Sequence, residues 1–374
     1  MVGSVMNRGA DMYRDIDAAE LAGRLGTDRE PLVLDVRDPD EVAEWAIPGS
    51  MNIPLRELGQ RIDALPRDRE VVTVCASGNR SAVAADALAH AGLRVANLRG
   101  GMAAWGAVYD WVVVEAGHAR VVQVRRRGKG CLSYVVGDTS GDEAFVIDPS
   151  IDTDVYFDIA DEHGWRIAHV FDTHLHADHL SGARTLTEQA NAVLHLNPAD
   201  TFDFTFTPLH DGDRFPLADG VELSVAALRT PGHTEGSTIY FVGDRIVLTG
   251  DTLFVDGVGR PDLAERAEEF AHNLYRSLHD RILVLPDDAL VLPGHYGDAV
   301  RVTPDAPVGA TLAMLRATLE PLSFDEKAFV AWATARTTPR PPNYVEIIKA
   351  NMGHPNLTAT ELQRLEVGPN RCSA

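Results

Sequence analysis

The first part of the chain alternates short apolar runs with amphipathic stretches. Apolar runs at 31–36, 71–75 and 94–98 have the length of buried strands, and the alanine-rich segment 80–92 has helical spacing. Strands that alternate with helices predict a parallel sheet, because a parallel connection needs a crossover segment. We therefore expect a parallel α/β unit of roughly a hundred residues in this part of the chain.

The pattern changes near residues 110–118. Beyond that point, strand-like runs closed by turn residues alternate with helical patterns at 153–163 and 180–190; the runs lie at 121–124, 131–138, 143–150, 167–174, 237–251 and 290–295. These elements predict a mixed, layered α/β domain with sheets flanked by helices. From residue 305 onward the pattern is helical, until the proline-rich segment 336–342 interrupts it.

Composition and charge narrow the classes of function. The 374 residues, 45% hydrophobic and 24% charged, can bury folded cores, which excludes intrinsic disorder. The chain contains 34 Lys and Arg residues and 55 Asp and Glu residues, so its formal net charge is −21. That charge disfavours nucleic acid or an anionic membrane as a partner.

The cellular location of the protein is predicted from its apolar runs and its cysteines. No apolar stretch approaches the ~20 residues of a membrane span, and the first residues lack the apolar core of a signal peptide. Cys75, Cys131 and Cys372 are too few and too scattered for a disulfide framework, which indicates a reducing compartment. We expect a cytoplasmic protein.

Cys75 is the first candidate for chemistry. It ends the apolar run VVTVC and is followed by ASGNRS and the predicted helix. A thiol in such a loop faces backbone N–H groups and a helix N-terminus, which lower the pKa of a thiolate, and Arg80 adds a fixed positive charge. The pattern favours attack on sulfur and storage of a persulfide, because the same N–H groups stabilise an anionic terminal sulfur. The alternative is a buried cysteine that only fills the core.

Three motifs in order resemble a single rhodanese domain. The start motif, active-site loop and end motif of that family correspond to LDVRDPDEVAEWAIPGSMNIPL at 34–55, CASGNRSA at 75–82 and LRGGMAAW at 98–105, within residues 12–112. The resemblance implies that Cys75 carries the persulfide and that the loop from Ala76 to Arg80 surrounds it. At Ala46 many relatives carry a histidine before Ile-Pro-Gly, and we interpret this difference as structural.

A second group of candidates follows the strands of the later domain. Seven imidazole and carboxylate side chains lie at or just beyond predicted strand ends: His174, His176, Asp178, His179, His233, Asp251 and His295. Strand ends meet at one edge of a sheet, and such nitrogen and oxygen ligands suit zinc, iron or manganese. The sequence therefore predicts a metal site, with Asp178 and His179 at the start of a helix.

These motifs resemble the metallo-β-lactamase superfamily over residues 118–300. The resemblance implies an αββα sandwich with the metal at one edge of paired sheets, and residues 301–374 would form a helical extension packed on that domain. Superfamily membership alone does not determine the reaction.

Five segments together resemble the persulfide dioxygenases: GCLSYVVGD, DTHLHADHLSGA, TPGHTEGSTIY, TGDTLFVDGVGRPDL at 249–263 and PPNYVEIIKAN at 341–351. The resemblance implies one Fe(II) per chain, held by His174, His233 and Asp251, with the remaining histidines around these ligands. Two imidazoles and one carboxylate on one face of iron leave positions open for a substrate sulfur and O₂.

A two-metal hydrolase would use all seven groups. His174, His176 and His233 would bind one ion, Asp178, His179 and His295 would bind the other, and Asp251 would bridge two zinc ions around a hydroxide. That arrangement corresponds to a thioester hydrolase of glyoxalase II type. Residues 305–335 lack the Arg and Lys cluster expected for glutathione binding in that enzyme, which weighs against it.

Several further residues have two interpretations. Arg260 and Asp262 follow the Asp251 motif in a glycine-rich loop, where they either shape a sulfur-substrate pocket or form a surface ion pair. Cys131 and Tyr134 are expected to pack in the core. The arginines at 125–127 are expected at a solvated strand end rather than in a site for an anionic thiol such as glutathione.

Both predicted modules handle sulfane sulfur. We expect a fusion enzyme that oxidises a low-molecular-weight thiol persulfide with O₂ to sulfite, while Cys75 transfers sulfur to or from sulfite and thiosulfate. A homodimer is an expectation from the family resemblance. The remaining alternative is a non-catalytic sulfur carrier whose metal domain is structural.

Overall fold

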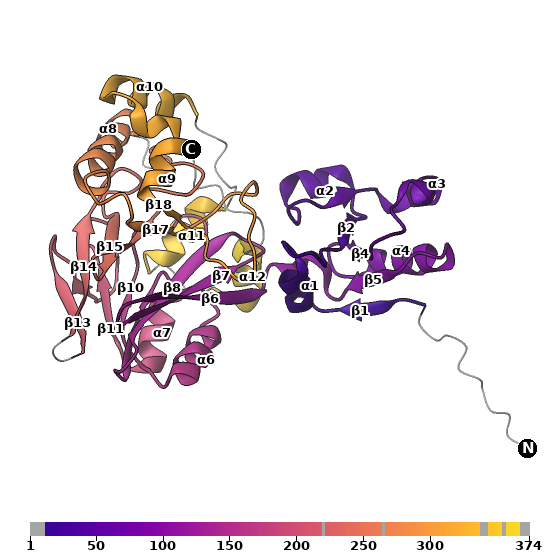
Figure 1. The fold of residues 1–374 in the computed structure, drawn as a ribbon, viewed down its shortest axis with the longest axis horizontal. Helices are drawn as coiled ribbons and strands as arrows, with labels where there is room; N and C mark the ends of the chain where they lie inside the picture. The colour runs from indigo at the N-terminus through magenta and orange to yellow at the C-terminus, as the bar shows by residue number, and fades with distance from the viewer. Residues whose placement is uncertain (1–11, 219–220, 264–265, 337–342, 354–356, 367–374) are drawn as a thin grey trace, which may run out of the picture. The chain divides into compact units, whose positions relative to one another are not determined.

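The computed structural model describes residues 12–218, 221–263, 266–336, 343–353 and 357–366, and the chain divides into Met1–Asp110 and Trp111–Ala374 (Figure 1). Most of the proline-rich segment expected at 336–342, and the two prolines of the motif at 341–351, lie outside the described residues. No helix in the described ranges is long and apolar enough to cross a membrane.

The first unit contains a sheet of five parallel strands, in the order β1 (Arg14–Ile16), β5 (Val95–Leu98), β4 (Val71–Val74), β2 (Leu32–Asp35) and β3 (Met51–Asn52). Its helices are α1 (Ala18–Arg24), α2 (Pro39–Glu44), α3 (Leu58–Arg61), α4 (Asn79–His90) and α5 (Gly101–Trp105), with 3₁₀ turns at Leu55–Glu57 and Ile62–Ala64. The prediction of a parallel α/β unit is confirmed.

Successive side chains of these strands point to opposite faces, so the sheet has two cores. Val72 and Val74 of β4 pack on the side of α1 and α5. Val71 and Cys75 pack on the side of α3 and α4. Burial on both faces explains why the strands are uninterrupted apolar runs in the sequence.

The second unit contains two sheets. The seven-stranded sheet has the order β12 (Thr207–Pro208), β11 (Val193–Leu196), β10 (Arg166–Phe171), β9 (Glu143–Ile147), β8 (Cys131–Asp138), β7 (Ala119–Arg126) and β6 (Tyr109–Ala116). The six-stranded sheet has the order β13 (Arg214–Ala218), β14 (Val221–Arg229), β15 (Thr238–Val242), β16 (Ile246–Gly250), β17 (Leu290–Pro293) and β18 (Ala310–Thr311).

Helices cover the outer faces of the two sheets. α6 (Asp154–His163) and α7 (Ala183–Ala190) contact the seven-stranded sheet. The other sheet is covered by α8 (Ala267–Ser277), the π-helix Leu278–Ile282, α9 (Leu312–Thr318), the 3₁₀ turn Glu320–Ser323 and α10 (Glu326–Ala335). The last two helices are α11 (Tyr344–Asn351) and α12 (Ala359–Glu366). The expected layered arrangement of sheets and helices is confirmed.

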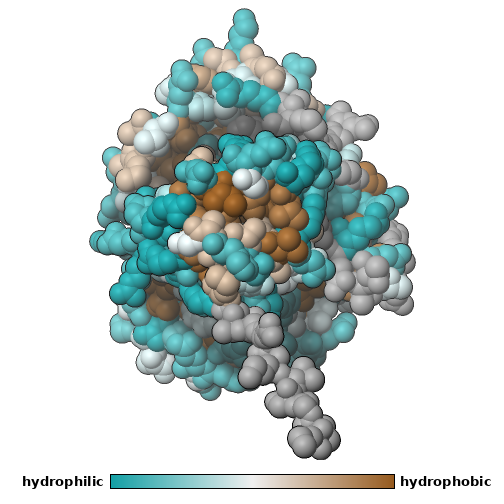
Figure 2. Space-filling view, turned by 90° about the vertical axis from the view of Figure 1, so that its right-hand side faces the viewer, coloured by the Kyte–Doolittle hydropathy of each residue, from teal (hydrophilic) through white to brown (hydrophobic). Residues whose placement is uncertain are grey.

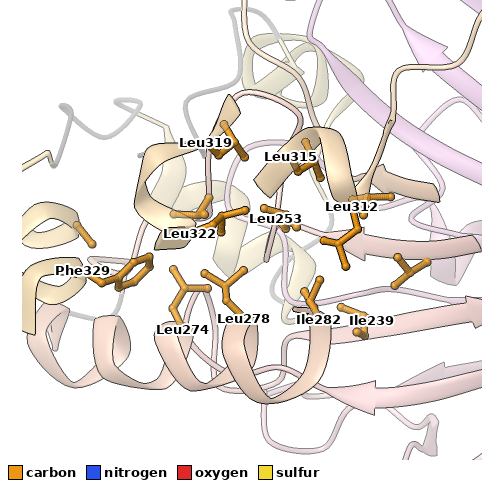
Figure 3. Packing of buried hydrophobic residues seen from close by; sticks show 14 of the residues in the cluster. Ile239, Leu253, Leu274, Leu278, Ile282, Leu312, Leu315, Leu319, Leu322 and Phe329 are labelled. Carbon is orange, nitrogen blue, oxygen red and sulfur yellow. The ribbon is translucent and has the colours of Figure 1, made fainter. Parts of the chain in front are cut away.

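Two apolar clusters hold these layers together. Tyr134, Phe145 and Leu248 belong to the cluster between the sheets. In the outer cluster, Leu274 and Leu278 meet side chains of α9 and α10 (Figure 3). The view in Figure 2 shows a mainly hydrophilic surface with a hydrophobic patch near its centre.

The two sheets are joined at the edge where β10 and β16 end. The backbone N–H of Thr238 donates to the carbonyl oxygen of Thr173 at 2.8 Å, which ties β15 to the loop after β10. Gly250 ends β16 with φ 49°, and a Cβ there would lie 2.6 Å from Oγ1 of Thr173. Glycine therefore permits the close approach that brings both strand ends to one edge.

Candidate persulfide loop and metal centre

Cys75 follows β4, the central strand of the first sheet, and its side chain is buried. The N–H of Gly78 donates to its Sγ at 3.2 Å, and the hydroxyl of Ser81 donates at 3.4 Å. Burial raises the pKa of the Cys75 thiol, but hydrogen bonds from Ser81 and from backbone N–H groups of the loop outweigh burial and lower the pKa. The loop therefore stabilises a thiolate.

The start of α5 is hydrogen-bonded to this loop. The N–H groups of Met102 and Ala103 donate to the carbonyl oxygens of Cys75 and Ala76, at 2.8 and 3.1 Å. Gly101 has φ +58°, and a Cβ on it would lie 2.1 Å from the carbonyl oxygen of Cys75. Only glycine allows this contact.

The Arg80 guanidinium binds Glu41 rather than the sulfur. Its Nη1 and Nη2 donate to the two carboxylate oxygens of Glu41 at 2.7 and 2.6 Å. Hydrogen bonding to Arg80 lowers the pKa of Glu41 to about 2. The positive charge expected beside Cys75 is thus partly compensated. Hydrogen bonds from Ser81 and from the backbone N–H groups of Ser77 and Gly78 lower the pKa of the Cys75 thiol.

In the second unit, His174, His233 and Asp251 form one buried cluster at the joined sheet edge, with ligand atoms within 4.8 Å of one another. Nε2 of His174 lies 3.8 Å from Oδ2 of Asp251, and Nε2 of His233 lies 3.5 Å from the same oxygen. None of these three atoms has a hydrogen-bond partner among the described residues. Buried polar atoms without partners are destabilising, so the cluster fits a bound cation.

The opposite nitrogens of the two imidazoles are held by hydrogen bonds. Nδ1 of His233 donates to the carbonyl oxygen of Arg260 at 3.1 Å, and Nδ1 of His174 lies 2.9 Å from Oγ1 of Thr173. Because the Thr173 hydroxyl donates to Asp148, its oxygen accepts from His174. Burial lowers the pKa of both His174 and His233. Both rings are therefore neutral, with an Nε2 lone pair directed at the cluster.

Asp178, His179 and His295 gather in a second buried cluster together with Cys131. Nε2 of His295 and Nδ1 of His179 lie 2.6 and 3.2 Å from the Asp178 carboxylate. Sγ of Cys131 lies 4.0 Å from Oδ2 of Asp178. Burial raises the pKa of Cys131, but His179 and His295 lower it to about 6.

Cys131 was expected only to pack in the core. Cys131 lies in this polar cluster because it forms an isolated antiparallel bridge with His295. Next to this bridge, the N–H of Leu132 donates to the Gly294 carbonyl oxygen at 2.8 Å. This contact between distant strands has no signal in the sequence beyond the position of Cys131 at the start of an apolar run.

His176 belongs to a third group, with Asp148 and Asp172. Its Nε2 lies 3.1 Å from Oδ1 of Asp148 and 3.8 Å from Oδ1 of Asp172. Although burial lowers the pKa of His176, the two carboxylates raise it well above its usual range. Neither aspartate was predicted as a site residue, although both follow apolar strands.

The expectation that Asp178 and His179 lie at the start of a helix is wrong. The segment 172–182, called the metal loop below, contains no helix, and α7 begins at Ala183. Ser181 bridges to Ser150, and the N–H of Gly182 donates to the carbonyl oxygen of Pro149 at 2.7 Å. These contacts keep the chain non-helical up to residue 182.

Arg260 and Asp262 form a buried ion pair. Nε and Nη2 of Arg260 donate to the two carboxylate oxygens of Asp262 at 2.7 and 2.8 Å, and Arg260 is 1% exposed. The alternative of a surface pair is therefore wrong. Because the Arg260 carbonyl oxygen also accepts from His233, the pair fixes the loop that orients this histidine.

The arginines at 125–127 are buried, so the expectation of a solvated strand end is wrong. Arg125 donates to the carbonyl oxygens of Thr303 and Ala306 at 2.8 and 3.0 Å. Arg126 forms an ion pair with Glu366. Contacts with segments far along the chain, which strand periodicity does not encode, cover these side chains.

Comparison with known families matches two parts of the chain. The rhodanese-like domain matches residues 17–108. The metallo-β-lactamase superfamily matches residues 126–295. The first match contains Cys75, and the second contains all seven candidate ligands.

Relatives match part of the chain. The chain is 32% identical over 193 residues to an uncharacterized protein of Mycobacterium leprae, covering 44% of this chain and 86% of that protein. It is 31% identical over 169 residues to the human mitochondrial persulfide dioxygenase ETHE1, covering 44% of this chain and 63% of that protein. The crystal structure of ETHE1 from Myxococcus xanthus matches with 28% identity and a TM-score of 0.56, over 63% of this chain and 99% of that one.

Proposed function

The chain belongs to the metallo-β-lactamase superfamily and carries a rhodanese-like domain ahead of that domain, and on this premise we propose that it is a persulfide dioxygenase with sulfurtransferase activity. The observation that carries the proposal is the set of three buried, unpartnered atoms on His174, His233 and Asp251. Two neutral imidazoles and one carboxylate form the ligand set of non-haem Fe(II) oxygenases.

We assign one Fe(II) per chain to these three residues. Iron held there would supply open coordination positions for a persulfide sulfur and for O₂. His174 and His233 present neutral Nε2 atoms, because Thr173 and the Arg260 carbonyl oxygen hold their Nδ1 protons. His295 binds Oδ1 of Asp251 and leaves Oδ2 for the metal. All three ligand side chains are buried.

The proposed substrate is a low-molecular-weight thiol persulfide such as glutathione persulfide. One persulfide, one O₂ and one water give one thiol, one sulfite dianion and two protons, so atoms and charge balance. The S–S bond of the persulfide breaks, its terminal sulfur is oxidised, and O₂ is reduced. Arg260 and Asp262 would shape the pocket through the loop that they hold together, since neither is an exposed charge.

Cys75 is proposed to carry sulfane sulfur. Its thiolate attacks the outer sulfur of a persulfide or of thiosulfate, the S–S bond of the donor breaks, and a thiolate or sulfite leaves. The Gly78 N–H and Ser81 hydroxyl, which hydrogen-bond Sγ in the structure, lie beside the new sulfur. Attack of sulfite on that sulfur breaks the Cys75 S–S bond, releases thiosulfate and restores the thiolate; the reverse direction uses the same atoms. Arg80 holds the loop through Glu41. A cytoplasmic location and a homodimer complete the proposal.

The competing candidate is a dinuclear thioester hydrolase of glyoxalase II type, and the cluster of Cys131, Asp178, His179 and His295 favours it. Measuring metal content and O₂ uptake on one sample of purified protein separates the two. About one iron per chain, with O₂ uptake on addition of glutathione persulfide, is the expected result. Two zinc ions with thioester cleavage and no O₂ uptake would overturn the proposal.

Two variants test the assignment of residues. Asp251→Ala should lose iron and O₂ uptake while its far-UV circular dichroism is retained, whereas Asp244→Ala, at an exposed turn, should behave as wild type. Unchanged turnover in Asp251→Ala would make the metal domain structural. Cys75→Ser should keep O₂ uptake and lose thiosulfate formation from sulfite.

A further inference from the structure

Each of two helices near the C-terminal end of the second unit places one polar side chain against the metal loop. Asn351 is the last residue of α11, and Glu366 is the last residue of α12. Both helices are yellow in Figure 1. Between them, the two side chains bind four backbone groups of residues 176–181.

Asn351 uses both ends of its amide. Its Nδ2 donates to the carbonyl oxygens of His176 and His179 at 2.9 and 2.8 Å. Its Oδ1 accepts from the N–H of Ser181 at 3.0 Å. An amide has two donor hydrogens and one acceptor oxygen, so aspartate at this position could not donate and alanine could make none of the three bonds.

Glu366 is a buried carboxylate. Its Oε1 accepts from the N–H of Leu180 at 2.6 Å. Its other oxygen forms an ion pair with Arg126 and lies 3.9 Å from Nζ of Lys129. Burying a carboxylate is costly unless it is paired, and these two cations supply the pairing. The cations thus hold the acceptor that binds the loop.

The metal loop needs such partners, because it has no helix and its regular pairing is limited to the Ser181 bridge. Backbone groups of buried segments must find hydrogen-bond partners, and for residues 176, 179, 180 and 181 the partners are Asn351 and Glu366. The same loop carries His174, whose Nε2 faces Asp251.

We propose that Asn351 and Glu366 are positioning residues of the metal centre, and that α11 and α12 complete the centre instead of only covering the domain. This inference rests on the proposed function for the identity of the bound metal. The contacts that position the loop do not depend on that function. The competing view is that these helices only bury apolar surface, since Leu180 packs against Ile347 and Leu365.

The test uses Co(II) alone as the probe, added to the metal-free full-length protein. Chelator competition gives its affinity, and its visible ligand-field bands report the geometry of the ligands. Asn351→Ala and Glu366→Ala should bind Co(II) roughly 10–100-fold more weakly and change these bands, because outer hydrogen bonds orient metal ligands. Matched controls are Lys349→Ala on α11 and Arg364→Ala on α12, both exposed, which should match wild type.

Wild-type Co(II) affinity and bands in both alanine variants would overturn the proposal. If either alanine variant fails to fold, Asn351→Asp and Glu366→Gln decide. Asn351→Asp keeps the acceptor and loses the donors, so it should bind Co(II) more weakly than wild type. Glu366→Gln keeps an oxygen for Leu180 but loses the charge that pairs with Arg126 and Lys129, so it should also bind Co(II) more weakly. Wild-type Co(II) affinity and bands in both of these variants would overturn the proposal. If the variants behave with Co(II) as expected but the Fe(II)-loaded wild-type protein shows no O₂ uptake with glutathione persulfide, the proposed function alone would be contradicted.

Discussion

Nδ1 of His295 lies 2.6 Å from Oδ1 of Asp251, and this contact turns the other carboxylate oxygen toward His174 and His233. Burial raises the pKa of Asp251, but His295 and the other imidazoles outweigh burial and lower it, so the carboxylate is ionised. His295 thereby acts on the candidate metal cluster through Asp251, while its Nε2 belongs to the neighbouring cluster beside Asp178.

His295→Ala should therefore weaken Fe(II) binding roughly 10–100-fold, because the Asp251 carboxylate loses the bond that orients it. Competition with a chelator measures the affinity. His210→Ala is the control, since that imidazole is exposed. Unchanged affinity in His295→Ala would show that the orientation of Asp251 does not depend on His295, and loss of one of two bound ions would favour the dinuclear alternative.

Ser81→Ala should shift the pH dependence of sulfur transfer at Cys75 to higher pH. The pKa of this thiol is lowered, so the reactive thiolate is present at lower pH than for an ordinary cysteine, and removing the Ser81 hydroxyl raises the pKa again. A hydrogen bond to a charged group contributes roughly 1.5–3 kcal/mol, so losing it should shift the pH dependence measurably.

The measurement is the rate of sulfite release from thiosulfate, the step in which the free Cys75 thiolate attacks the donor sulfur, across a pH series. Ser77→Ala is the matched control, because the loop bond from residue 77 to the sulfur comes from its backbone N–H. A midpoint that moves equally in both variants, or to lower pH in Ser81→Ala, would contradict the assignment.

Asp262→Ala should reduce the free energy of unfolding by roughly 3–5 kcal/mol, because it removes the carboxylate partner of buried Arg260. Asp288→Ala tests an exposed Arg–Asp pair, with Arg245 at 3.8 Å, and should change stability by less than about 1 kcal/mol. Urea titration compares the two variants. Equal losses would mean that burial does not distinguish these pairs.

Gly101→Ala should abolish sulfur transfer by Cys75 and leave the metal content unchanged. A Cβ at this position would lie 2.1 Å from the carbonyl oxygen of Cys75, and φ is +58°. Gly59→Ala, where a Cβ meets nothing within 4 Å, is the control. Sulfur transfer and metal content are measured on the same samples, and full transfer activity in Gly101→Ala would contradict the close packing of α5 against the loop.

Much of the fold was predictable because local periodicity encodes it. The apolar runs at 131–138 and 71–75 match β8 and β4 closely, and the helical pattern at 80–92 matches α4. Buried strands and helices impose their own spacing on the residues that form them. The start of α7 was not predictable, since residues 178–182 are kept out of the helix by contacts with Pro149 and Ser150.

The sequence by itself determined which side chains could do chemistry: a cysteine between a strand and a helix, and imidazoles and carboxylates at strand ends. Only the tertiary structure decided how they are grouped. It directed Nε2 of His176 to Asp148 although the His176 ring lies beside that of His174, added Cys131 to a polar cluster, and brought Asn351 and Glu366 to the metal loop. The reason is physical: spacing along the chain specifies which face of an element a residue occupies, whereas hydrogen-bond partners more than a hundred residues away depend on how the sheets and helices pack.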